Sequence, residues 1–232
     1  ELTVDKNSAV NALLSEVNAG KRINALIQGD VGCGKTVIAE LISAIFAVNG
    51  YQCVVMAPTK ILATQHYEDF KKLLTPVGIE VELLVAVQKA AERSARINDC
   101  SVKIIIVTSS ALSEKVVYKD LALLITDEEH RFGVAQREAL MEKAKDGIHC
   151  ISMSATPIPR SLALAIYGNS TRIIDVKTMP SGRKPVQTIL FGNEEKTYEA
   201  MYRQIAEGHQ CYIVWRLGDK SDSESMVSVV CV

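Results

Sequence analysis

The sequence predicts an open α/β fold whose parallel β-sheet is covered by helices on both faces. Short runs of apolar residues, rich in valine and isoleucine, alternate along the chain with segments of helical periodicity. The runs are apolar almost throughout, which is typical of parallel strands that are buried on both faces. We expect strands at residues 23–28, 52–57, 81–86, 103–108, 121–126 and 148–155, and helices at residues 35–48, 60–74 and 135–145.

The composition is that of an ordinary globular protein, because 48% of the 232 residues are hydrophobic and 23% are charged. The length favours one complete domain and part of another. The apolar runs are far shorter than the ~20 residues of a membrane-spanning helix, and the N-terminus lacks a signal pattern, so we expect a cytosolic protein. A net charge of −1 does not indicate a basic nucleic-acid-binding domain, although it allows a local basic groove.

The six cysteines are interpreted as small, reduced core residues. None of them belongs to a C-x-x-C pair, and no histidine stands nearby at metal-ligand spacing, so the sequence predicts no zinc site. The chain opens with glutamate and not methionine, which favours a piece of a longer translation product.

The pattern changes after residue 178. The segment MPSGRKP (179–185) contains two prolines and a glycine and is predicted to be a linker. Beyond it we expect a strand at 186–191, a helix at 194–207 and a strand at 210–215. One helix and two strands cannot bury a sheet on both faces. The predicted organisation is therefore one domain over 1–178, followed by an incomplete second domain or docking segment over 186–232.

Residues 29–36 (GDVGCGKT) match the P-loop pattern G-x-x-x-x-G-K-[ST], directly after a predicted strand and at the start of a predicted helix. The glycines allow backbone N–H groups to surround phosphates, and the helix N-terminus adds partial positive charge. Lys35 is expected to reach the β- and γ-phosphates, and Thr36 to ligate Mg²⁺. The predicted nucleotide-binding residues are Gly29, Asp30, Val31, Gly32, Cys33, Gly34, Lys35 and Thr36.

Two adjacent acids, Asp127 and Glu128, follow the apolar strand LALLIT. In a chain with a P-loop, Asp127 is suited to hold the metal's water shell, and Glu128 to orient the attacking water. The pair favours nucleotide hydrolysis over a small-molecule kinase, which would need a site for a phosphoryl acceptor.

Another strand end carries the hydroxyl residues Ser154 and Thr156 within SMSATPIPR (152–160). They could sense the metal and the phosphates and pass a shift into the helix that follows. The same residues also suit an ordinary strand-to-helix turn in which Thr156 is the helix cap.

The chain resembles the first motor domain of superfamily-two DNA helicases, and most closely the RecG type. The resemblance rests on GDVGCGKT, APTKILATQH (57–66), LLITDEEHRFGV (123–134), SATPIPRSLALAIYG (154–168) and GRKPVQT (182–188), in this order. HRFGV and TPIPR are more specific than the P-loop. Both are shared with the transcription-repair coupling factor, a double-stranded DNA translocase, which is the nearest alternative.

The resemblance implies a RecA-like fold and an ATP-dependent DNA helicase that remodels branched DNA in replication-fork repair and recombination, with ATP and Mg²⁺ as cofactors. ATP would lie between two RecA-like lobes, and the second lobe, expected to be absent from this chain, would supply arginines worth about 10³–10⁵ in rate. This chain alone is then expected to hydrolyse ATP weakly. Carried over by motif, the catalytic residues are Lys35, Asp127 and Glu128, and the residues that bind the metal are Thr36 and Asp127. The residues that couple hydrolysis to movement are Ser154, Thr156 and Arg131. The residues that contact the DNA backbone are Pro58, Thr59, Lys60, Thr108 and Ser109.

Two positions depart from the family's usual pattern. Lys6 stands where the family usually has a glutamine that reads the adenine edge, and Val107-Thr108-Ser109 replaces the usual Gly-Thr-His. These departures keep a second hypothesis open, in which the chain is a helicase-like module that binds nucleotide, DNA or another motor lobe without unwinding DNA.

Overall fold

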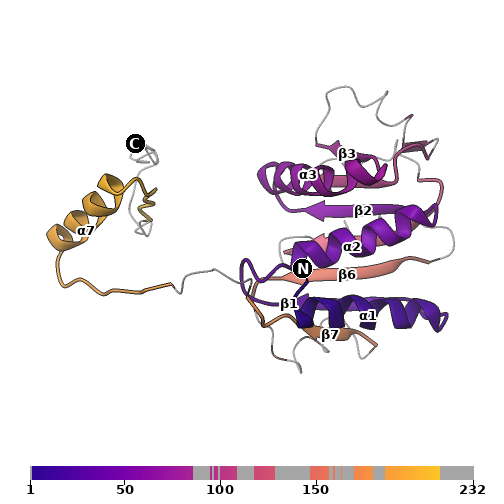
Figure 1. Cartoon of the computed structure of the whole chain (residues 1–232), viewed down its shortest axis with the longest axis horizontal. Coiled ribbons are helices and arrows are strands. Elements are labelled where there is room, and N and C mark those ends of the chain that lie inside the picture. Colours follow the sequence, from indigo (N-terminus) through magenta and orange to yellow (C-terminus); the bar gives the residue numbers. More distant parts are fainter. Residues whose placement is uncertain are drawn as a thin grey trace, which may run out of the picture. The chain divides into compact units, whose positions relative to one another are not determined.

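The computed structural model divides the chain into two compact units, Glu1–Arg183 and Lys184–Val232 (Figure 1). The division lies within the linker predicted at 179–185. The described residues are 2–85, 95, 97–98, 100–108, 118–128, 147–156, 159, 163, 170–179 and 186–214.

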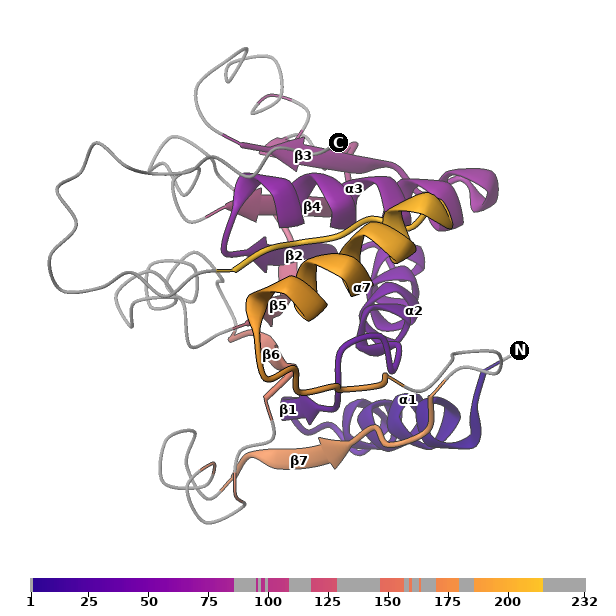
Figure 2. The same ribbon diagram turned by 90° about the vertical axis from the view of Figure 1, so that its left-hand side faces the viewer.

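The first unit is built on a parallel sheet, which within the described residues has seven strands in the order β3-β4-β2-β5-β6-β1-β7. Figure 2 shows the strands in this order, with β3 at the top and β7 at the bottom. The predicted fold class is confirmed. The strands are β1 (Asn24–Gln28), β2 (Gln52–Ala57), β3 (Val81–Leu84), β4 (Ile104–Thr108), β5 (Leu121–Asp127), β6 (His149–Ser154) and β7 (Arg172–Asp175).

Both faces of the sheet are buried, and β2 shows this most clearly. All of its residues are buried. Val55 faces a core cluster that also contains side chains of α1 (Val4–Asn18), α2 (Lys35–Val48) and α3 (Lys60–Leu74). Its neighbour Val54 belongs to a second cluster on the opposite face. Because successive strand residues point to opposite faces, a strand buried on both sides must be apolar throughout, which explains the pattern in the sequence.

The helices α2 and α3 have the predicted bounds, and each begins with a defined local feature. Gly34, at φ 94°, precedes the first residue of α2, and the Thr59 side chain caps α3 by accepting a hydrogen bond from the Leu62 N–H. A short 3₁₀ turn, η1 (Thr75–Val77), follows α3. The helix predicted at 135–145 lies outside the described residues. None of the helices in the described part of the chain is both long enough and apolar enough to cross a membrane.

Asp5, near the start of α1, holds the segment that leaves β7. Its carboxylate accepts hydrogen bonds from the backbone N–H groups of Lys177 and Thr178 and from the Thr178 hydroxyl. These bonds lower the pKa of Asp5, the Thr178 hydroxyl most strongly. On its other side, this segment continues the sheet, because the Val176 N–H donates to the Gln28 carbonyl at 2.8 Å.

In the second unit, the helix predicted at 194–207 is present as α7 (Glu194–Ala206), capped by the Asn193 side chain. The prediction of strands at 186–191 and 210–215 is wrong for the described residues of these ranges, because their backbone forms no strand. A strand needs a partner for its backbone N–H and C=O groups. The described part of this unit contains no such partner, and the apolar side chains of Leu190 and Val214 are 95% and 92% exposed.

Candidate ATP site

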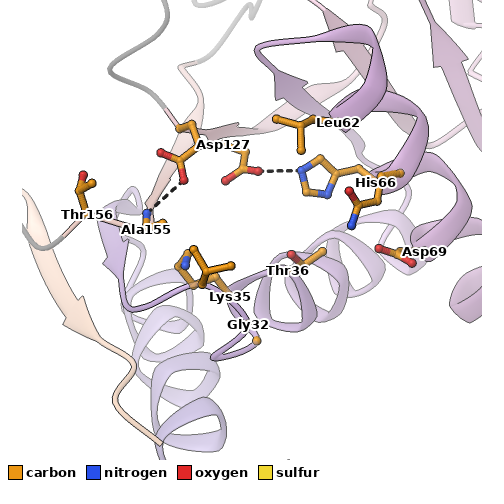
Figure 3. A pocket seen from close by; sticks show the side chains of 13 residues that line it. Gly32, Lys35, Thr36, Leu62, His66, Asp69, Asp127, Ala155 and Thr156 are labelled. Atoms are coloured by element: carbon orange, nitrogen blue, oxygen red, sulfur yellow. Dashed lines mark hydrogen bonds and ion pairs between the residues drawn. The ribbon is translucent and has the colours of Figure 1, made fainter. Parts of the chain in front are cut away.

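A pocket of about 640 Å³ lies beyond the carboxyl ends of β1, β5 and β6. This is where ligands bind in open parallel sheets, and the volume suits a small-molecule ligand. Figure 3 shows residues of the P-loop and α2 on one side of the pocket and Asp127 and His66 on the other. The pocket is lined by Val31, Gly32, Gly34, Lys35, Thr36, Leu62, Gln65, His66, Asp69, Asp127, Glu128, Ala155 and Thr156.

The P-loop is a compact turn between β1 and α2. The Cys33 N–H donates to the Asp30 carbonyl at 3.1 Å, and the Lys35 ammonium donates to the carbonyls of Gly29 at 2.6 Å and Asp30 at 3.2 Å. These hydrogen bonds hold the Lys35 side chain across the P-loop. The Cys33 side chain is fully buried beneath the loop, so its contribution to nucleotide binding can come only from its backbone.

Two glycines of the P-loop have neighbours where a Cβ atom would lie. A Cβ on Gly29 would collide with the Val176 carbonyl oxygen, and a Cβ on Gly34 would lie against the end of the Lys6 side chain, 2.7 Å from its Nζ atom. Lys6 itself is only 6% exposed. The departure noticed at position 6 therefore lies against the P-loop, a location that the sequence alone does not reveal.

Asp127 and Glu128 reach the pocket from the end of β5 and bond to two other elements. The Asp127 Oδ2 atom lies 2.8 Å from the His66 Nε2 atom on α3. The Glu128 Oε1 atom accepts a hydrogen bond of 3.2 Å from the Ala155 N–H. Glu128 has φ 51°, a left-handed conformation that is uncommon outside glycine and asparagine and that often marks functional sites.

The loop after β6 is closed by its own hydroxyl groups. The Ser154 Oγ atom lies 3.0 Å from the Thr156 Oγ1 atom and accepts a hydrogen bond from the Thr156 N–H. Thr156 lines the pocket, whereas Ser154 is buried behind it. Together with the Glu128–Ala155 bond, these contacts join the ends of β5 and β6. The predicted coupling residue Arg131 lies outside the described residues.

The predicted DNA-backbone residues follow the neighbouring strands β2 and β4, where Ala57 pairs with Thr108. Thr59 and Lys60 are exposed at the start of α3 after the half-buried Pro58. Thr108 is only 5% exposed, so its side chain is poorly placed to contact a phosphate. Ser109 lies outside the described residues, and the residues of this group that the structure describes do not line the ATP pocket.

The side chains that α3 contributes to the pocket were not identified from the sequence. Leu62, Gln65, His66 and Asp69 all line it. Their i, i+3, i+4, i+7 spacing places them on one face of the helix. This spacing can be read from the sequence, but it does not reveal what the face contacts.

Glu40 is a buried residue of α2, one helical turn after Thr36. Burial raises the pKa of Glu40 to about 7, the charge of Asp69 adds to the rise, and His66 acts in the opposite direction.

The side chains at this site suit a nucleotide bound with Mg²⁺. The P-loop glycines carry no side chain that would keep phosphates away from the backbone N–H groups, and Lys35, Thr36 and Asp127 offer an ammonium, a hydroxyl and a carboxylate. Mg²⁺ is usually bound through one or two protein oxygens and the substrate's phosphates, and Thr36 and Asp127 offer such oxygens at this site.

Comparisons with known proteins identify the family of the chain. Residues 4–165 match the family model of the DEAD/DEAH box helicases. The chain is 38% identical over 234 residues to the ATP-dependent DNA helicase RecG of Borreliella burgdorferi, covering 99% of this chain and 34% of that protein. It is 39% identical over 236 residues to RecG of Thermotoga maritima, covering 99% and 30%. The chain thus spans about a third of the length of these relatives.

Solved structures give the same result. A structure of RecG bound to a three-way DNA junction matches with a TM-score of 0.77 and 34% identity, over 90% of this chain and 28% of that one. The helicase domain of Pyrococcus furiosus Hef matches with a TM-score of 0.52 and 26% identity, over 70% and 38%. The resemblance to the motor domain of RecG-type helicases is confirmed. The chain belongs to the DEAD/DEAH box helicase family.

Proposed function

We propose that this chain is the ATP-binding motor lobe of a RecG-type DNA helicase or translocase, which couples ATP hydrolysis to the remodelling of branched or double-stranded DNA in replication-fork repair and recombination. The observation that carries the proposal is the meeting of Lys35, Thr36, Asp127 and Glu128 in one pocket. It is supported by the 38% identity to an ATP-dependent DNA helicase across nearly the whole chain. We expect the protein to act in the cytoplasm.

Each side chain of the pocket has a role in this proposal. The P-loop N–H groups and Lys35 bind the β- and γ-phosphates, and Thr36 and Asp127 hold Mg²⁺, which offsets phosphate charge when it is bound. Glu128 orients the attacking water and accepts its proton. Because Glu128 also bonds to the Ala155 N–H, a change at the acid reaches Ser154 and Thr156, which couple hydrolysis to movement.

The proposed DNA contact lies at Pro58, Thr59 and Lys60, and the resemblance to RecG-type helicases also assigns Thr108 and Ser109 to it. The hydroxyl of Thr59, the ammonium of Lys60 and the first N–H groups of α3 can bind phosphates without reading sequence. In our proposal, residues 1–178 form the first RecA-like lobe, 179–185 a linker, and 186–232 the start of a second lobe. In this proposal Arg131 acts with Ser154 and Thr156 in coupling hydrolysis to movement.

The decisive experiment measures binding of a fluorescent ADP and turnover of ATP, each with and without a three-way DNA junction, in the wild type and in Lys35→Ala. We expect nucleotide binding and slow, DNA-stimulated turnover in the wild type, and neither in Lys35→Ala. Equal binding by both proteins would contradict the assigned ATP site. Nucleotide binding with no response to DNA would favour a helicase-like interaction module over a motor.

A further inference from the structure

His66 is the one pocket residue that bonds directly to Asp127 within the described part of the chain. Its Nε2 atom lies 2.8 Å from the Asp127 Oδ2 atom, and the two side chains are 8% and 15% exposed. Figure 3 marks this contact with a dashed line between the Asp127 and His66 side chains, on the side of the pocket opposite the P-loop. No sequence motif and no comparison assigns a role to His66.

The direction of this hydrogen bond follows from its partners. A carboxylate can only accept, so Nε2 carries the hydrogen and donates it to Asp127. The other ring nitrogen, Nδ1, is buried without a hydrogen-bond partner among the described residues. The Asp127 bond is therefore what orients the ring, and in turn the ring fixes one oxygen of the carboxylate. A buried polar atom without a partner is costly and is rarely kept without a function.

The helix that carries His66 begins at the proposed DNA contact. Thr59 caps α3 and Lys60 is its first residue, so His66 lies about 9 Å further along the same helix, at 1.5 Å per residue. The two points belong to one continuous helix, and Ala63 between them is fully buried in the core. A displacement of the 58–60 loop that shifts this helix therefore also shifts the imidazole.

We propose that His66 is a positioning residue that holds the Asp127 carboxylate and transmits to it the state of the loop 58–60. This inference rests on the proposed function, because it takes Asp127 as the acid that holds Mg²⁺ and 58–60 as a DNA contact. It assigns the link between the two sites to a single hydrogen bond between α3 and β5, separate from the link through Glu128, Ala155 and Thr156.

The test compares two amide substitutions. His66→Gln keeps an N–H donor at nearly the reach of Nε2, whereas His66→Asn has the same chemistry but is too short. Glu68→Leu, on the exposed side of α3, is the control for changes to the helix. Each protein is titrated with fluorescent ADP at several Mg²⁺ concentrations, with and without a three-way DNA junction, and its thermal unfolding is recorded. His66→Leu replaces His66→Asn if the latter does not fold.

We expect the enhancement of ADP affinity by Mg²⁺ to fall about tenfold in His66→Asn, the lower end of the usual loss when a residue that orients a metal ligand is removed. The effect of DNA on ADP affinity should also disappear. His66→Gln and Glu68→Leu should behave like the wild type, and affinity without Mg²⁺ should be unchanged in all four proteins.

Equal Mg²⁺ and DNA responses in folded His66→Asn and His66→Gln would overturn the role of His66 and leave the ATP site intact. A wild type whose Mg²⁺-dependent ADP affinity does not respond to DNA would overturn the transmission. A wild type that binds no nucleotide would overturn the proposed function itself, so the two failures are distinguishable.

Discussion

Gly34 depends on a side chain that is distant in the sequence. The P-loop pattern requires glycine here because the backbone must surround phosphates, and the structure adds two further reasons. Gly34 adopts φ 94°, and the Lys6 side chain from α1 occupies the space where a Cβ would lie. Gly50, at φ 92°, has the same conformation, but a Cβ at that position would meet no atom within 4 Å. Substitutions at Gly50 and Gly34 can therefore be compared to distinguish the cost of backbone strain alone from the cost of strain with an added contact.

We expect Gly50→Ala to cost about 1–2 kcal/mol of stability, the strain of a left-handed alanine, and to leave nucleotide binding unchanged. Gly34→Ala should show the same strain and also lower nucleotide affinity by more than about tenfold, because Gly34 lines the pocket and its strained backbone no longer directs the P-loop N–H groups at the phosphates. Chemical unfolding and fluorescent ADP titration measure the two effects. Similar nucleotide affinities in the two variants would contradict this account of Gly34.

Residues could be predicted from the sequence where a motif fixes both their type and their place. The P-loop and strand-end motifs predict Lys35, Thr36, Asp127 and Glu128, and these side chains lie together in the pocket, because parallel strands all deliver their carboxyl ends to one edge. His66 could not be predicted in the same way. Its bond to Asp127 spans 61 positions and depends on the packing of α3, which no local pattern specifies.

The helices α2 and α3 present titratable groups to each other beside the pocket. Glu40 on α2 is 6% exposed, and burial raises its pKa to about 7, helped by Asp69 and opposed by His66. An unfolded glutamate has a pKa of about 4.3. Because the folded protein holds this proton more tightly, Glu40 contributes stability below about pH 4.3 that is lost as the pH rises through about 7.

We therefore expect Glu40→Gln, which is neutral at every pH, to be more stable than the wild type at pH 8 by about 1–2 kcal/mol, a value reduced for solvent screening. The difference should shrink towards pH 5. Urea unfolding of both proteins at the two pH values tests this, with Glu68→Gln on the exposed side of α3 as the surface control. A stability difference that does not change with pH would show that Glu40 is not the titrating group.

Elements were predictable where apolar periodicity was strong. The first residues of α2 and α3 agree with the prediction, because Gly34 and Thr59 stand at the N-caps of these helices. The strand β7 was missed because its residues are at most half-buried, so it lacks the continuous apolar run of a central strand. The strands expected at 186–191 and 210–215 did have apolar runs, but a strand also requires a partner, which local sequence does not contain.

At the scale of the whole molecule, the core belongs to the first unit. The two core clusters draw on residues from Ala9 to Met179, and β7 joins the sheet beside β1. No residue of α7 is buried, and large apolar side chains of the second unit, such as Leu190 and Val214, are exposed.

We expect a chain shortened after Arg183 to keep the unfolding temperature and the nucleotide affinity of the full chain, because both core clusters and the P-loop remain. A chain shortened after Ser170 should unfold at a much lower temperature and bind nucleotide weakly. It lacks β7, the Val176 contact with Gly29 and the bonds from Asp5 to Thr178. Circular dichroism melting and fluorescent ADP titration make the comparison. If the chain ending at Arg183 also lost its cooperative transition, residues beyond 183 would be required for the fold of the first lobe, and the proposed division at 179–185 would be wrong.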